Sequence, residues 1–160
     1  MSHWGKRSST HDVHTMAQRI LILCTGNSCR SQMAQVIWQE LAGNQALVES
    51  AGSAPAGYVH PLAIEALREL QLPTEGLASK PLEPFMEQME QPIDLAVTVC
   101  DHAQQACPSL PHVKNRLHWP FDDPADATGS DEEKMQVFRR VRDEISNRIT
   151  QYLASSEGNA

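Results

Sequence analysis

Several features that mark common protein classes are missing from this sequence of 160 residues. There is no basic excess, because 13 Lys and Arg stand against 20 Asp and Glu, and the formal net charge of −7 excludes a general nucleic-acid binder. The longest apolar run, Ile20–Cys24, is far shorter than the roughly 20 residues that a membrane-spanning helix needs. No G-x-x-x-x-G-K-[ST] motif occurs, which argues against a nucleotide triphosphate site.

Cysteine is scarce, with four residues at positions 24, 29, 100 and 107. A chain of this size can bury roughly 68 to 70% of its unfolded surface, so it needs no disulfide framework or structural metal to fold. Residues 1–18 lack the apolar core of a secretory signal, and we expect a cytoplasmic protein. In that compartment cysteines are reduced, and they are more often catalytic, metal-bound or buried than crosslinked.

The hydrophobic pattern alternates between segments typical of strands and segments typical of helices. Strands are predicted at residues 19–24, 46–50, 94–99 and, as a short segment, within 113–119. Helices are predicted from Ser31 to Gly43, from Pro61 to Pro73, over 82–89, and after Ser130. This alternation predicts an α/β domain with a parallel sheet.

Three of the predicted helices have a recognisable apolar face or start signal. The first should bury Ala34, Ile37 and Leu41, and the second an apolar face that includes Leu70. For the last helix, Ser130 and Glu133 form an S-x-x-E capping box. Its core-facing stripe is predicted to consist of Phe138, Val141, Ile145, Ile149 and Tyr152.

The domain organisation that we expect is simple. Residues 1–18 are interpreted as a flexible N-terminal extension, residues 19–155 as a single domain, and residues 156–160 as a tail. No repeat, low-complexity tract or second domain is evident.

The loop after the first strand, Cys24-Thr25-Gly26-Asn27-Ser28-Cys29-Arg30-Ser31, is the main candidate site. In open parallel sheets, ligands bind beyond the carboxyl ends of the strands. Gly26 can adopt backbone angles closed to other residues and Asn27 tolerates the left-handed region, so the loop can turn its N–H groups inward as a nest for an anion. The following helix adds its positive N-terminal end.

Cys24 and Arg30 supply the chemistry that this loop suggests. A helix N-terminus and a cationic neighbour can lower a thiol pKa from about 8.5 to roughly 3.5 to 7.5, which predicts a nucleophilic thiolate at Cys24. The guanidinium of Arg30 can bind two oxygens of a phosphate-like anion. Ser31 could donate a hydrogen bond to the sulfur when it becomes a leaving group.

Taken together, these motifs resemble thioredoxin-coupled arsenate reductases, which share the fold of low-molecular-weight protein tyrosine phosphatases. The resemblance covers about residues 19–153 and is carried by motifs in the same order: Cys24–Ala34, Ser50–Gly52, Val97–Cys100, Cys107-Pro108, and His118-Trp119 through Asp122–Ala125. It implies a three-layer fold in which helices cover both faces of a four-stranded parallel sheet. It also implies arsenate as substrate, with phosphate or sulfate as mimics, no bound cofactor, and thioredoxin as electron donor.

The resemblance further implies a role for each matching residue. Cys24 forms a covalent adduct with arsenate, while Arg30 and the loop amides from Thr25 to Arg30 stabilise the oxyanion. Asp123, directly before Pro124, protonates the leaving oxygen, with Asp122 as the alternative acid. Cys100 then attacks Cys24 and releases arsenite, and Cys107 attacks Cys100 by ordinary thiol exchange. Disulfide-linked Cα atoms lie only about 4.4 to 6.8 Å apart, so segment 100–107 is expected to change shape.

Three other interpretations stay open at this stage. A low-molecular-weight phosphatase would use Cys24, Arg30 and Asp123 without the other two thiols, although Ala125-Asp126-Ala127 after the Asp-Pro favours a small inorganic substrate. An oxyanion- or metal-binding module without turnover is a non-enzyme alternative. A zinc site is disfavoured because C-x4-C and C-x6-C do not match the common paired spacing; its ligands would come from Cys24, Cys29, Cys100, Cys107 and His102.

Two further expectations concern ions and assembly. Some relatives bind potassium at positions that match Asn27 and Ser50, but Gln35 replaces their acidic residue, so potassium dependence is not expected here. No resident metal is predicted, and we expect a monomer that interacts with neither nucleic acid nor membranes. Cys29 is interpreted as a structural residue whose backbone contributes to the loop.

Overall fold

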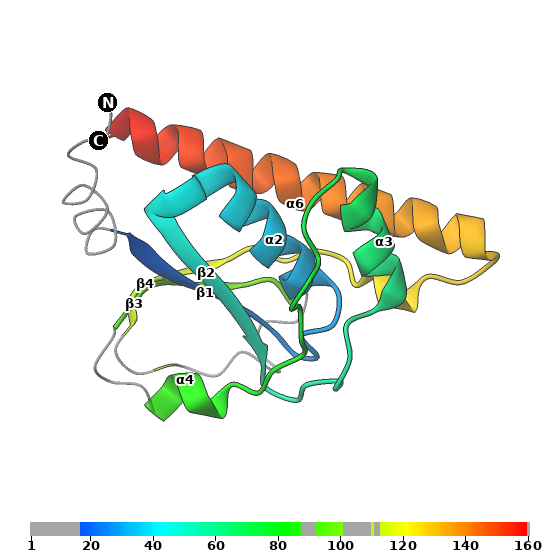
Figure 1. Cartoon of the computed structure of the whole chain (residues 1–160), viewed down its shortest axis with the longest axis horizontal. Helices are drawn as coiled ribbons and strands as arrows, with labels where there is room; N and C mark the ends of the chain where they lie inside the picture. The colour runs from blue at the N-terminus through cyan, green and yellow to red at the C-terminus, as the bar shows by residue number, and fades with distance from the viewer. Residues whose placement is uncertain (1–16, 88–91, 101–109, 111–112, 160) are drawn as a thin grey trace.

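The computed structural model describes residues 17–87, 92–100, 110 and 113–159 (Figure 1). Four strands are present: β1 (Gln18–Cys24), β2 (Ala46–Gly52), β3 (Ile93–Thr98) and β4 (Val113–His118). The helices are α2 (Arg30–Ala42), α3 (Pro61–Glu69), α4 (Glu83–Glu87) and α6 (Asp131–Asn159), with short 3₁₀ turns η1 (Gly43–Gln45) and η2 (Pro124–Asp126). Each strand and helix predicted from the sequence is found, although the end of the predicted helix 82–89 lies outside the described residues.

The four strands form one sheet in the order β2-β1-β3-β4, and every pairing is parallel. The register places Cys24 opposite Gly52, and Thr98 opposite both Leu23 and His118. The carboxyl ends of all four strands therefore meet along one edge, which is where ligands bind in this class of fold. The predicted parallel α/β sheet is confirmed.

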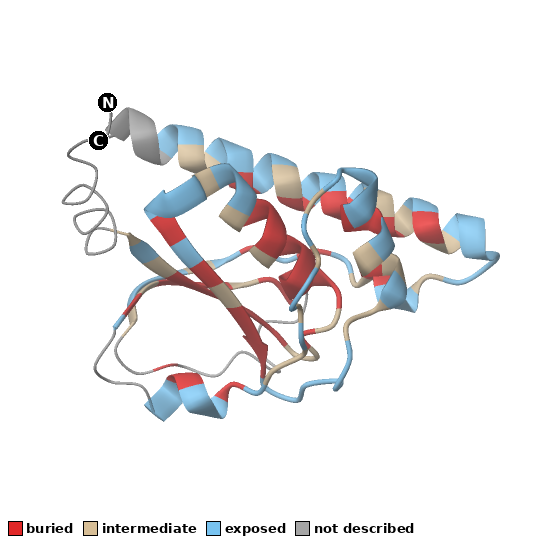
Figure 2. Cartoon of the chain, viewed as in Figure 1, coloured by how far each residue is buried: buried red, intermediate tan, exposed pale blue. Residues whose placement is uncertain are grey.

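Helices cover both faces of this sheet, which gives three layers (Figures 1 and 2). The long α6, with α2 and α3, packs on one face, and the short α4 lies on the other. Along β1, Ile20 and Ile22 belong to the first core cluster, whereas Leu21 and Leu23 belong to the second. Because both faces are covered, β1 is apolar at successive positions instead of alternating with polar ones.

An aromatic cluster joins α2 and α6 to the segment that follows β4. The rings of Trp38 and Trp119 stack with centroids 5.6 Å apart and an interplanar angle of 11°. Tyr152 packs against both rings, and the Arg148 guanidinium lies 5.0 Å from the Trp119 ring. Buried aromatic pairs of this kind stabilise a fold beyond their apolar area alone, so Trp119 is a fixed starting point for the chain that leads from β4 to η2.

The last helix follows its prediction closely. Ser130 Oγ accepts a hydrogen bond from the Glu133 amide at 3.1 Å, and Glu133 Oε1 accepts one from the Ser130 amide at 2.7 Å, so the capping box is present. The predicted stripe from Phe138 to Ile149 is buried. The helix continues to Asn159, so residues 156–159, which were expected as a tail, are helical.

Two leucines predicted on buried faces are instead exposed: Leu41 by 48% and Leu70 by 46%. Leu41 lies in the last turn of α2, and Leu70 is the residue that ends α3. Both leucines are thus at the C-terminal ends of their helices, and periodicity alone does not reveal which turns of a helix are covered. The volume in the core is filled by Met33 and Trp38, each at most 1% exposed. In the described part of the chain, no helix has the length and apolar character needed to cross a membrane.

Candidate functional site

Two cysteines lie together at the carboxyl edge of the sheet. The Val99 amide donates to the Leu23 carbonyl at 2.9 Å, so the residues that follow, Cys24 and Cys100, emerge from neighbouring strands at the same level. Both cysteines are buried, with exposures of 5% and 3%, and their thiols are hydrogen-bonded to each other. Cys24, Cys29 and Cys100 are all reduced in the described structure.

This thiol pair changes the expected ionisation of Cys24. The hydrogen bond to Cys100 and burial raise the pKa of Cys24 well above the range of an ordinary thiol. The charge of Arg30 and the amide of Thr25 act in the opposite direction, but they are the weaker influences. The prediction of a lowered pKa was therefore wrong for this arrangement, because it considered the loop and the helix end but not a second buried thiol.

Asn27 organises the loop between β1 and α2. It is fully buried and has a φ of 49°, so it adopts the left-handed conformation that the sequence suggested. Its Nδ2 donates to Ser31 Oγ at 2.7 Å and to Ser50 Oγ at 3.0 Å, while its Oδ1 accepts from the Lys80 amide at 2.8 Å. Because Ser31 Oγ accepts from Asn27, its own proton remains available to another acceptor. One buried amide thus connects the loop to β2 and to segment 78–80.

A second loop, residues 53–60, runs beside the first and binds its carbonyl groups. Ala54 donates to the Thr25 carbonyl and Ala56 to the Gly26 carbonyl, each at 2.9 Å, and His60 donates to the Ser28 carbonyl at 3.0 Å. In a trans peptide the carbonyl and the following N–H point in opposite directions. The amides that follow these carbonyls therefore point away from loop 53–60, which leaves them available to an acceptor on the other side, as an anion nest requires.

The glycine that permits this arrangement is Gly52, not Gly26. A Cβ on Gly52 would lie 2.5 Å from the Thr25 carbonyl oxygen, whereas a Cβ on Gly26 would meet only Ala56 Cβ at an ordinary 3.8 Å. Gly26 does not have a left-handed φ, so the special backbone angles expected for it are not used. The constraint is a close approach between the end of β2 and the loop.

Arg30 begins α2 and points toward the segment after β4. Its Nη1 donates to the Phe121 carbonyl at 3.0 Å, and its Nη2 lies 3.3 Å from Asp123 Oδ2. The other oxygen of Asp123 accepts from the Ala125 amide at 3.0 Å, which caps η2. The neighbouring Asp122 points elsewhere: its side chain is 72% exposed and pairs with Arg140 at 3.3 Å. Of the two acids considered, the structure brings Asp123 to Arg30.

Of the remaining candidate residues, some lie in the described part of the structure and two do not. Burial raises the pKa of Cys29 to about 11, so this thiol is neutral near pH 7. Ser50 Oγ donates to Gln35 Oε1 at 2.5 Å, so Gln35 is joined directly to the Asn27 network. Cys107 and His102 lie outside the described residues. Within the described part, no group of three or more His, Cys, Asp or Glu side chains could hold a metal ion.

Sequence reasoning missed two supports of the loop. Gln32 is fully buried, and its Nε2 donates to the Asn27 carbonyl at 2.9 Å and to the Ala78 carbonyl at 2.8 Å. The Phe121 carbonyl fixes one end of Arg30. A polar residue in the first turn of a helix usually faces solvent, so the local sequence does not indicate that Gln32 is buried. The bond to the Phe121 carbonyl could not be predicted either, because every residue has a main-chain carbonyl.

A buried cysteine, an arginine and loop amides that are free of the neighbouring loop, at the end of a parallel strand, are typical of proteins that bind oxyanions. A family model described as low molecular weight phosphotyrosine protein phosphatase matches residues 19–159. The chain therefore belongs to the low molecular weight phosphotyrosine protein phosphatase family, which is a family of enzymes.

Within this family the chain is similar to proteins named arsenate reductase. It is 48% identical over 130 residues to an arsenate reductase of Halalkalibacterium halodurans, a match that covers 81% of this chain and 91% of that protein. A solved arsenate reductase in the phosphate binding state has a TM-score of 0.69 at 27% identity, covering 86% of this chain and 98% of that one. A thioredoxin-dependent arsenate reductase of Corynebacterium glutamicum has a TM-score of 0.68 at 24% identity, covering 98% of this chain and 74% of that one, which is a likeness of fold.

Proposed function

We propose that this chain reduces arsenate to arsenite, using Cys24 as nucleophile and Cys100 and Cys107 as a thiol relay that thioredoxin recharges. The observation that carries the proposal is the hydrogen-bonded pair of Cys24 and Cys100 beside the loop of residues 24–31, here called the oxyanion loop. A phosphatase needs one cysteine there, whereas a reductase needs a second thiol within reach of the first. Proteins named arsenate reductase at up to 48% identity support the same choice.

The first step is formation of a bond between Cys24 and arsenic. The thiol must lose its proton, and the positive charge of Arg30 and the Thr25 amide favour the resulting thiolate. The thiolate attacks arsenate, and one oxygen leaves as water after receiving a proton from Asp123, which lies beside Arg30. Arg30 and the loop amides of residues 25–30 stabilise the negative charge on the other oxygens. Ser31 stabilises the sulfur of Cys24.

The second step is the reduction itself. The sulfur of Cys100 attacks the sulfur of Cys24, the sulfur–arsenic bond breaks, and its electron pair leaves with arsenic as arsenite. Arsenic gains two electrons and the two thiols become a Cys24–Cys100 disulfide. Cys107 then attacks Cys100, which releases Cys24 as a thiolate and leaves a Cys100–Cys107 disulfide. A thioredoxin dithiol reduces this disulfide in the same way. In this role the protein would act in arsenic detoxification in the cytoplasm.

The test is arsenate-dependent consumption of NADPH in the presence of thioredoxin and thioredoxin reductase. We expect the parent to turn over continuously, and Cys100→Ser and Cys107→Ser to fall to the background rate because the relay is interrupted. Hydrolysis of an aryl phosphate serves as the control, since it requires Cys24, Arg30 and Asp123 alone and would show that both variants are folded. Equal NADPH consumption by all three proteins would contradict the relay.

A low-molecular-weight protein tyrosine phosphatase is the second candidate, and the family match over residues 19–159 favours it. The Arg30–Asp123 arrangement suits both reactions, since each protonates an oxygen that leaves a tetrahedral centre. The same pair of assays separates the two functions. A phosphatase would hydrolyse the aryl phosphate efficiently and would leave NADPH consumption independent of arsenate.

A further inference from the structure

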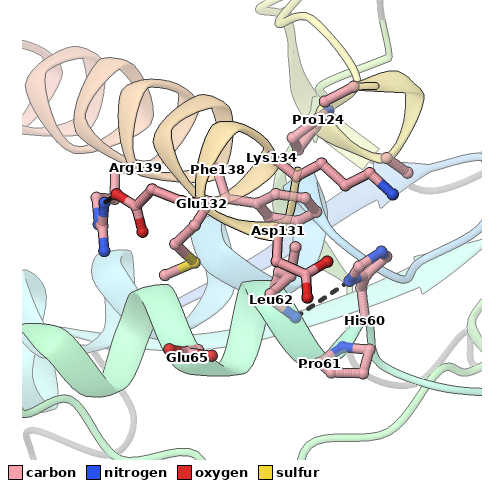
Figure 3. A pocket seen from close by; sticks show the side chains of 13 residues that line it. His60, Pro61, Leu62, Glu65, Pro124, Asp131, Glu132, Lys134, Phe138 and Arg139 are labelled. Carbon is pink, nitrogen blue, oxygen red and sulfur yellow. Dashed lines mark hydrogen bonds and ion pairs between the residues drawn. The ribbon is translucent and has the colours of Figure 1, made fainter. Parts of the chain in front are cut away.

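A cleft of about 470 Å³ lies beside the acid-bearing turn η2, between the first turns of α3 and α6 (Figure 3). Its lining includes Leu62 of α3, Phe138 of α6 and Pro124 of η2. His60 lies on its wall and is the residue through which the oxyanion loop, α3 and α6 are joined.

Three contacts hold His60, each to a different element. Its backbone amide donates to the Ser28 carbonyl of the oxyanion loop at 3.0 Å. Its Nδ1 accepts a hydrogen bond from the Leu62 amide at 3.1 Å and thereby caps the N-terminus of α3 (Figure 3). Its ring packs on Phe138 of α6, with centroids 4.7 Å apart. The residue whose backbone amide holds the Ser28 peptide is thus itself fixed, through its side chain, to two helices.

The cap works in only one protonation state of the ring. Helices are usually capped by Ser, Thr, Asp or Asn, whose oxygen atoms remain acceptors near neutral pH. A neutral imidazole has one acceptor nitrogen, and the bond from Leu62 assigns that role to Nδ1 and the proton to Nε2. In the imidazolium ion both nitrogens are donors, so Nδ1 would face the Leu62 amide with a proton and the cap would be lost.

We propose that His60 is a positioning residue for the oxyanion loop, and that it holds the loop in its anion-binding geometry only while its ring is neutral. The proposal concerns regulation of the site described under the proposed function and rests on that function for its biological meaning. Its physical content, a link between one histidine and oxyanion affinity, holds for any tetrahedral anion that the loop binds.

The charged groups around His60 set where the change occurs. Burial lowers the pKa of His60, and Lys134 of α6 acts in the same direction, whereas Asp123 after β4 acts against them. Lys134 extends over the same side of the cleft as the ring (Figure 3). Asp131 of α6 and Glu65 of α3 also line the cleft. The folded ring therefore releases its proton more readily than a free histidine, and the cap should be lost as the pH falls through the folded pKa, which lies below the ordinary value of 6.5.

Two substitutions separate titration from packing. His60→Asn supplies a capping oxygen that does not titrate, and His60→Ala supplies none. We expect His60→Asn to bind inorganic phosphate like the parent at pH 8. Once the pH is low enough to protonate the His60 ring of the parent, the variant should bind more tightly by about two- to five-fold, on the usual effect of a helix cap. His60→Ala should bind phosphate more weakly than the parent at pH 8 by a similar factor. The ratio of variant to parent affinity at each pH cancels the titration of phosphate itself.

The matched control is His118→Asn. His118 is exposed and its Nδ1 bonds Thr98 Oγ1 at 2.7 Å, so it is a histidine at the same edge of the sheet that caps no helix. Its substitution should leave the pH dependence of phosphate binding unchanged. Nitrogen NMR of the His60 ring in the parent should show an unprotonated Nδ1 at pH 8.

An affinity ratio of His60→Asn to parent that stays constant while nitrogen NMR shows the His60 ring gaining its second proton would overturn the proposal, as would a proton on Nδ1 at pH 8. Because phosphate binding involves no electron transfer, these outcomes are independent of whether the chain reduces arsenate. A failure of the NADPH assay with an intact pH-dependent affinity ratio would reject the proposed function and keep the role of His60.

Discussion

At the scale of single residues, the thiol of Cys24 is controlled by its neighbours in opposing directions. Cys100 and burial raise the pKa of this thiol and favour its protonated form, whereas Arg30 and the Thr25 amide favour loss of the proton. A neutral nucleophile is protected from unwanted oxidation and alkylation, because the thiolate is the reactive form. In the proposed relay, Cys100, which the second step needs, would therefore also suppress the reactivity of Cys24 before the first step.

This arrangement predicts a specific effect of Cys100→Ala. Removing the hydrogen-bond partner should lower the pKa of Cys24, so its alkylation by iodoacetamide should begin at a lower pH than in the parent. Peptide mapping by mass spectrometry would follow Cys24 separately from the other thiols. Cys29, whose pKa is set by burial and by neighbours other than Cys100, provides the internal reference. An unchanged or raised alkylation midpoint for Cys24 would show that Cys100 does not control its proton.

At the scale of elements, the oxyanion loop depends on the end of β2 as much as on its own sequence. Parallel pairing sets Gly52 beside Cys24, and the next peptide of the loop then approaches Gly52 closely. The loop is further held by loop 53–60 and by segment 78–80 through Asn27. Its shape is therefore a property of three chain segments that are distant in the sequence.

We expect Gly52→Ala to be far more damaging than Gly26→Ala. The added methyl at position 52 would lie 2.5 Å from the Thr25 carbonyl oxygen, so backbone must move, whereas the one at position 26 finds ordinary contact distances. Overpacking of this kind costs typically about 1 to 3 kcal/mol. Urea unfolding of both variants would measure the difference. Equal unfolding midpoints would show that the loop can move aside without cost.

These elements also show where prediction from sequence succeeds and where it fails. Strands, helices and the capping box at Ser130 are encoded locally, by composition, periodicity and short motifs, and they were predicted well. Asn27 was predicted because its residue type itself tolerates the left-handed region. Gly52 as the tight contact, the Gln32 bonds and the raised pKa of Cys24 were missed, because each arises from segments that meet only after folding.

At the scale of the whole molecule, Glu69 joins the end of α3 to the long helix α6. It accepts hydrogen bonds from Arg139 Nε at 2.9 and 3.0 Å and from Arg142 Nη1 at 2.8 Å. Arg142 is 7% exposed and also donates to the Ala66 carbonyl at 2.9 Å. Arg139 first, and Arg142 with it, lower the pKa of Glu69 below its usual value. Charges of both signs thus connect the two helices that flank the cleft.

This connection predicts a pH dependence of stability. A carboxyl group whose pKa is lowered by folding stabilises the folded state above its unfolded pKa, about 4.5 here, and that contribution is lost as the pH falls through the folded value. Glu69→Gln should therefore reduce the urea midpoint at pH 7, and its difference from the parent should shrink below pH 4.5. Glu144, which forms an exposed ion pair with Arg140, offers the control, since Glu144→Gln removes only that surface ion pair. A difference that persists unchanged at pH 3 would contradict an electrostatic origin.

The five residues from Trp119 to Asp123 form a short bridge with both ends anchored. Trp119 is stacked on Trp38 at one end, and at the other the Phe121 carbonyl and Asp123 are attached to Arg30. The Asp123 carboxyl group, which belongs to this segment, can therefore reach few positions. In the proposed reaction, Asp123 could protonate only an oxygen that the loop holds at one place. The positions of the two anchors, more than the length of the Asp123 side chain, would then determine which oxygen leaves.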